Sequence, residues 1–163
     1  MNSYRLLASI FEEIKNNKEK YYKLNSSNNF EDQIENLFKM RGFTKIPSDK
    51  NAKISTISER EQISIQEAMK KFSELKGKVT SKNGIEVLKN PFKNIRMDFI
   101  AQPFGSQNFP DFLIFCSDYI FSLEIKSNKN KNKVSTPLPM WNSNLPKAQA
   151  IYIYIYIYIL AII

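Results

Sequence analysis

Hydrophobic residues recur every three or four positions through the N-terminal half of the chain, a spacing typical of amphipathic helices. Residues 4–24 and 28–41 show this spacing, and residues 57–76 show it again before Gly77, which is expected to end that helix. Residues 44–56, which lie between the second and third of these stretches, are polar and are expected to form a linker. The N-terminal half is therefore predicted to be helical.

The pattern changes to that of β-strands in the second half. Residues 95–101 alternate apolar and polar side chains, while residues 112–116 and 119–125 are dense in β-branched and aromatic side chains. Ser117 and Asp118 lie between the last two stretches and favour a tight turn. We therefore expect an antiparallel hairpin in the same sheet as residues 95–101.

A two-residue turn fixes the register of this hairpin. Cys116 then faces Tyr119, and Asp111 lies opposite Glu124. Side chains that are directly opposed point to the same face, with Cβ atoms about 4.5–5.5 Å apart. The period of two along a strand places Lys126 on this face as well, while the alternate positions form a core face. The sequence thus predicts two carboxylates and a lysine on the reverse of a hydrophobic face.

Two adjacent carboxylates repel each other and need a cationic partner. Mg²⁺ prefers oxygen ligands and is usually held by one or two carboxylates together with waters and substrate phosphates. An alternative interpretation is that Glu124 and Lys126 belong to a solvated strand face and that Asp111 is a turn residue. Leu113 and Phe115 share that face, however, and a solvated face would be polar throughout. The acids are therefore expected at the edge of a buried region.

The residues Pro-Asp at 110–111 and Glu-Ile-Lys at 124–126 resemble the signature of the nuclease superfamily named for its Pro-Asp…(Asp/Glu)-x-Lys motif. The segments 102–107 and 140–146 resemble parts of bacterial type II restriction endonucleases of this superfamily. The resemblance covers roughly residues 30–154. It implies an α/β, restriction-endonuclease-like core in which helices flank a mixed central β-sheet.

The resemblance also implies roles for single residues. In this family the aspartate and glutamate bind Mg²⁺ and the lysine orients or activates the attacking water, and these roles fall on Asp111, Glu124 and Lys126. The main-chain carbonyl of Ile125 is expected to be a further metal ligand. Related nucleases often supply another acid from a preceding helix, for which Glu31 is the candidate. Glu31 also suits the positive end of a helix, so both interpretations stay open.

Charge favours a polyanionic partner, because Lys and Arg outnumber Asp and Glu by 24 to 16 and the net charge is +8. Nucleic acid is favoured over membrane, although a Lys-rich composition is equally expected from an AT-rich genome. The candidate contacts lie in the loop before Asp111, in the polar run after the hairpin and beside Trp141. They are Ser106, Gln107, Lys129, Lys131, Asn142 and Ser143.

Several classes of chemistry are excluded by what the sequence lacks. There is no histidine, which removes Ser-His-Asp and Cys-His nucleophiles and histidine-based zinc sites. The single cysteine, Cys116, lies in an apolar strand and is expected to pack in the core. The four glycines match no phosphate-binding loop. Charged residues come too early for a signal peptide, so a cytoplasmic location is expected.

Residues 151–159 alternate Ile and Tyr and predict a strand beside the strand of Glu124. An alternating A-T tract encodes such a repeat, and such tracts slip during replication. We therefore expect a frame-shifted or phase-variable form of a longer enzyme, truncated at its C-terminus, with residues 160–163 as a non-native tail. The fold would then be incomplete at this end.

Together these observations predict a single nuclease-like domain over residues 1–163. Its parts are N-terminal helices (1–43), a linker and helix (44–94), a catalytic sheet (95–159) and the tail. The predicted function is Mg²⁺-dependent, sequence-specific cleavage of double-stranded DNA as a type II restriction endonuclease, as a homodimer with a cognate DNA methyltransferase. The alternatives are an inactive, truncated DNA-binding remnant and a repair or recombination nuclease of the same superfamily.

Overall fold

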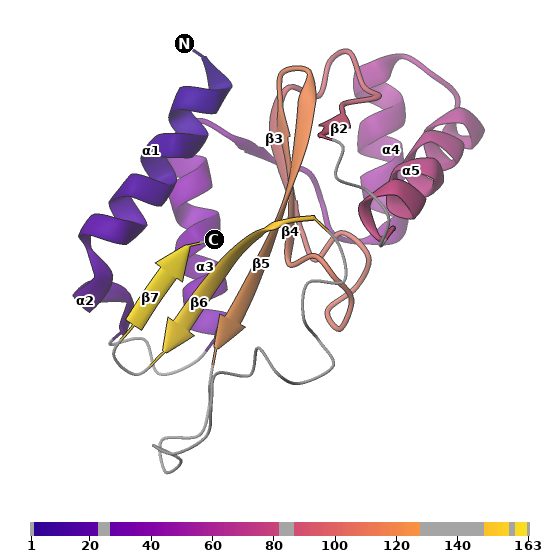
Figure 1. Ribbon diagram of the computed structural model, residues 1–163. Helices are drawn as coiled ribbons and strands as arrows, with labels where there is room; N and C mark the ends of the chain where they lie inside the picture. The colour runs from indigo at the N-terminus through magenta and orange to yellow at the C-terminus, as the bar shows by residue number, and fades with distance from the viewer. Residues whose placement is uncertain (1, 23–26, 82–86, 128–148, 157–158, 163) are drawn as a thin grey trace.

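The computed structural model describes residues 2–22, 27–81, 87–127, 149–156 and 159–162. In this part of the chain, helices cover both faces of one mixed β-sheet, which confirms the predicted α/β class (Figure 1). The elements are α1 (Ser3–Asn16), α2 (Lys18–Tyr22), α3 (Ser27–Met40), β1 (Thr44–Lys45), α4 (Lys50–Glu61), α5 (Ile65–Val79), β2 (Leu88–Lys89), β3 (Met97–Ala101), β4 (Phe112–Cys116), β5 (Tyr119–Ser127), β6 (Ile151–Tyr156) and β7 (Ile159–Ile162).

The predicted hairpin forms the centre of the sheet. The strand order is β1-β3-β4-β5-β6-β7, with β2 paired to the start of β5. β4 and β5 are antiparallel, and Cys116 faces Tyr119 while Phe112 faces Leu123, as the two-residue turn requires. Ser117 in the turn has a positive φ of 47°. The predicted register is therefore confirmed, and β3 lies on the other side of β4 as expected.

The N-terminal helices pack against one face of this sheet. The Asn2 side chain caps α1 by accepting a hydrogen bond from the Tyr4 N–H at 2.9 Å. Gly42 follows α3 with a φ of +87°, a conformation in which a residue without Cβ is favoured. The side chains of α1 and α3 that pack against this face of the sheet are Leu6, Leu7, Ile10, Ile14, Phe30, Ile34, Leu37 and Phe38.

The predicted linker over residues 44–56 is wrong, because this segment contains β1 and most of α4. The Asp49 carboxylate caps α4 by accepting hydrogen bonds from the N–H groups of Asn51 and Ala52. The predicted helix over residues 57–76 is in fact the end of α4 and most of α5. Gln62, with a φ of 56°, separates the two helices, and α5 continues past Gly77.

A second hydrophobic cluster covers the opposite face of the sheet. Strand β4 supplies side chains to both clusters in alternation: Phe112 and Ile114 face α1 and α3, whereas Leu113 and Phe115 face α4 and α5. The acids were expected at the edge of a buried region on this reverse face, and α4 and α5 do bury most of it. Cys116 is fully buried, which confirms its packing role.

The Ile-Tyr repeat forms a strand as predicted. β6 runs parallel to β5, with Tyr152 as the register partner of Glu124, and β7 pairs antiparallel with β6. β7 includes most of residues 160–163, and its pairing does not bear on whether those residues are native. Among the described helices, none has the length and apolar character needed to cross a bilayer.

Candidate active site

Asp111 and Glu124 meet at one end of the β4–β5 pair. Asp111 directly precedes β4, and Glu124 follows Leu123, the partner of Phe112. The Asp111 N–H donates a hydrogen bond to Oε2 of Glu124 at 3.2 Å. Oδ2 of Asp111 in turn accepts one from the Ile125 N–H at 2.6 Å. Each carboxylate is thus held by the backbone beside the other, and the predicted juxtaposition is present.

The environment of the pair raises the pKa of Asp111 from its ordinary value of 3.8 to about 7. Burial of the carboxyl group is the largest cause, and the negative charge of Glu124 is the next. The Ile125 N–H and the Lys126 ammonium act in the opposite direction. Glu124 is itself buried, with 8% of its surface exposed. The fold therefore disfavours the charged form of Asp111 beside Glu124.

Lys126 lies on the same side of β5 as Glu124, two residues further along. Its amino group forms an ion pair with Oε1 of Glu124. The Lys126 side chain is 35% exposed, whereas that of Glu124 is only 10% exposed. The lysine therefore extends from the buried acids to the surface, where a substrate would approach.

Glu31 in α3, just after the first turn of that helix, also belongs to this site. Its charge contributes to the raised pKa of Asp111. Oε2 of Glu31 accepts a hydrogen bond from Nε2 of Gln102 at 3.4 Å, and the Gln102 N–H donates to the Asp111 carbonyl at 2.6 Å. Gln102 thus connects Glu31 to the main chain of Asp111. Its backbone is left-handed, with a φ of 49°. In the sequence, Gln102 belongs to the family-like segment 102–107, but the motif gives it no role.

Carboxylate oxygens are the donors that this site offers to a divalent cation. In the described ranges, no group of three or more His, Cys, Asp or Glu side chains could hold a metal ion. Asp111 and Glu124 offer a pair, which suffices for Mg²⁺ when waters and substrate oxygens complete the shell. Oδ1 of Asp111 has no hydrogen-bond partner among the described residues. The chemistry of the pair therefore fits Mg²⁺.

Ile125 is placed to contribute its main-chain carbonyl to the same site. In an extended strand, the N–H and C=O of one residue are directed to the same side. Because the Ile125 N–H bonds Asp111, its carbonyl is directed toward the acid pair and away from β6. Its role as a metal ligand stays a prediction.

The predicted DNA contacts divide into two groups. Ser106 and Gln107 are exposed in the loop that precedes Asp111, on the chain segment that also contains Gln102. The others, Lys129, Lys131, Asn142 and Ser143, lie outside the described residues. Their placement relative to Asp111 stays a prediction.

Replacing Asp111 with asparagine is expected to stabilise the metal-free protein by on the order of 2 kcal/mol at pH 7. The folded pKa of about 7 lies above 3.8, so the folded chain retains a proton that the unfolded chain has released. Wild-type stability should therefore fall as pH rises from about 4 to 7, and this contribution should level off above pH 7. Urea unfolding in EDTA at several pH values measures the difference; an Asp111→Asn variant less stable than wild type at pH 7 would contradict it.

Comparisons of the chain with models of protein families, with curated proteins and with solved structures found no match. Support for a function therefore comes from the geometry of Asp111, Glu124, Lys126 and Glu31 and from the charge of the chain.

Proposed function

We propose that this protein is a Mg²⁺-dependent deoxyribonuclease with a restriction-endonuclease-like core. The observation that carries the proposal is the buried pair of Asp111 and Glu124, with Lys126 bound to its exposed side. Acids enclosed in this way are costly to a fold unless a cation joins them. The sequence motif suggested the same three residues, and the fold brings Glu31 to them as well.

In this proposal the acidic residues bind and orient the cofactor. Asp111, Glu124 and the Ile125 carbonyl would hold Mg²⁺, while Gln102 and Glu31 fix the position of Asp111. When bound, Mg²⁺ polarises a phosphate and lowers the pKa of a coordinated water. Lys126 orients the attacking water and stabilises the negative charge that develops on the phosphate oxygens. With no histidine in the chain, carboxylate and lysine chemistry remains for the proton transfers.

The proposed substrate is double-stranded DNA. A net charge of +8 favours binding to its phosphates. The resemblance to type II restriction endonucleases suggests sequence-specific cutting, a homodimer whose two-fold symmetry matches a palindromic site, and a cognate methyltransferase that protects host DNA. These partners follow from the proposed enzyme class.

Incubation with supercoiled plasmid in Mg²⁺ tests the proposal. We expect linear fragments of defined size with Mg²⁺ and intact plasmid with EDTA. Cutting at positions determined by DNA structure, such as branches or ends, and not by base sequence would instead indicate a repair or recombination nuclease. Salt-sensitive DNA binding without any cleavage would indicate the DNA-binding remnant and overturn the enzymatic proposal.

A further inference from the structure

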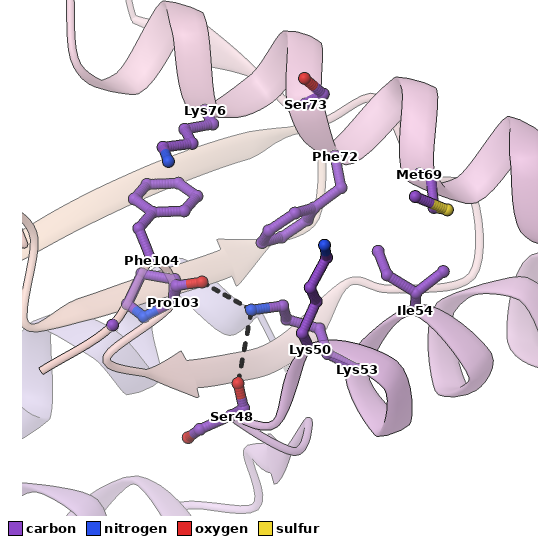
Figure 2. A pocket seen from close by; sticks show the side chains of 11 residues that line it. Ser48, Lys50, Lys53, Ile54, Met69, Phe72, Ser73, Lys76, Pro103 and Phe104 are labelled. Carbon is purple, nitrogen blue, oxygen red and sulfur yellow. Dashed lines mark hydrogen bonds between the residues drawn. The ribbon is translucent and has the colours of Figure 1, made fainter.

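A pocket of about 630 Å³ lies between α4, α5 and the loop at residues 103–105, apart from the acid pair (Figure 2). Its size is in the range of sites for small ligands, roughly 300–1,000 Å³. Three lysines line it, Lys50 and Lys53 from α4 and Lys76 from α5, and no acidic side chain does. The pocket is therefore strongly cationic.

Lys53 is the fixed part of this cationic site. The residue is only 5% exposed, and its amino group donates hydrogen bonds to the Pro103 carbonyl at 2.6 Å and the Ser48 carbonyl at 3.4 Å. The same amino group lies 4.8 Å from the centre of the Phe72 ring. Burial lowers the pKa of Lys53, while the negative charge of Asp49 acts in the opposite direction. The two carbonyls and the ring hold the Lys53 amino group in the wall of the pocket.

Lys50 and Lys76 supply more mobile charge at the rim. Both residues are exposed, and neither forms an ion pair with a carboxylate in the described part of the chain. The Lys76 amino group lies 5.6 Å from the centre of the Phe104 ring. Figure 2 shows that the two lysines approach the pocket from different helices. An anion between α4 and α5 would thus meet ammonium groups from both sides.

The other wall of the pocket is apolar. Ile54, Met69 and Phe72 form it, and Met69 is 46% exposed although it is a large hydrophobic residue. This wall is continuous with the lysines, so the pocket joins a cationic region to an apolar one. A ligand that matches both needs an anionic group attached to an apolar, compact body.

We infer that this pocket binds a nucleotide unit, with its phosphate between Lys50 and Lys76 and its base against Ile54, Met69 and Phe72. Lysine ammonium groups bind phosphate as compact point charges, and a base presents a planar apolar face. The unit is either a free nucleotide or the 5′-phosphorylated end of a DNA strand, since both present the same chemistry. This site is separate from the acid pair and does not require that the protein be a nuclease.

Calorimetric titration of the full chain in EDTA tests the inference. We expect 5′-dAMP to bind saturably and more tightly than inorganic phosphate or deoxyadenosine. The double substitution Lys50→Gln and Lys76→Gln should weaken dAMP binding roughly tenfold or more. The matched control is Lys70→Gln with Lys78→Gln, which removes equal charge from exposed positions of α5 outside the pocket and should leave the affinity unchanged.

A blunt duplex with and without a 5′-phosphate distinguishes the two sources. Phosphate-dependent binding of the duplex that the pocket variant loses would assign the site to DNA ends, and binding of dAMP alone would assign it to free nucleotides. Equal affinity for inorganic phosphate and dAMP, equal loss in the control variant, or no saturable binding of dAMP would overturn the inference. Because no Mg²⁺ or cleavage is involved, these outcomes leave the nuclease proposal to its own test.

Discussion

Replacement of Lys126 with alanine is expected to reduce plasmid cleavage by roughly 100-fold or more. The Lys126 side chain reaches from Glu124 to the surface, so its loss removes the charge proposed to face the scissile phosphate. Asp111→Ala should have a similar effect, because it removes one of the two carboxylates proposed to hold the cation. Initial cleavage rates at saturating Mg²⁺ measure both variants.

Two matched controls separate these effects from a change in charge. Lys89→Ala removes an exposed lysine of β2, beside the opposite end of β5, and Asp118→Ala removes an exposed carboxylate in the hairpin turn. Both should cleave plasmid at nearly the wild-type rate. Cleavage by folded Lys126→Ala protein at the wild-type rate would contradict the role assigned to this lysine.

Replacement of Arg60 with alanine is expected to lower the free energy of unfolding by about 3 kcal/mol. Arg60 in α4 forms an ion pair with Asp98 in β3 at 2.5 Å, and the Asp98 side chain is only 1% exposed. A second nitrogen of Arg60 donates to the Asn94 carbonyl at 3.0 Å. Without Arg60, the Asp98 charge would be left buried and unneutralised. Urea unfolding measures the loss.

Arg96→Ala is the matched control for this pair. Arg96 pairs with Asp118 at 2.7 Å, but both side chains are more than half exposed, so its loss should cost under about 1 kcal/mol. Adding Asp98→Asn to Arg60→Ala should restore part of the lost stability, because it removes the buried charge. Equal losses in Arg60→Ala and Arg96→Ala would show that burial of Asp98 is not the cause.

The hairpin and its acids were predictable because strong local rules act together there. A two-residue turn and a period of two leave one register, which places Asp111 opposite Glu124. The helical spacing of the apolar residues Ile34, Leu37 and Phe38 likewise predicted α3. That Glu31 would lie close enough to influence Asp111 followed from the family resemblance, since helix periodicity alone placed it only at the edge of the stripe.

The first part of α4, by contrast, was not predictable from the same signals. α4 buries Ile54 and Ile57 together with Lys53. Because lysine counts as a polar residue in a hydrophobic pattern, the sequence did not predict its burial. Lys53 is tolerated inside because the Pro103 carbonyl, distant in sequence, accepts a hydrogen bond from its amino group. The bridging position of Gln102 depends on a left-handed backbone and on contacts with two separate elements. Such long-range partners have no local signature.

We propose that Asp111 and Glu124 jointly hold one divalent cation. Anomalous diffraction from crystals soaked in Mn²⁺, which takes the same oxygen ligands as Mg²⁺, tests this binding. We expect a single strong peak bonded to carboxylate oxygens of both residues in the wild-type protein, and no peak there in Asp111→Asn crystals. An ordered site with Lys126 still paired to Glu124 and no peak between the acids would contradict it.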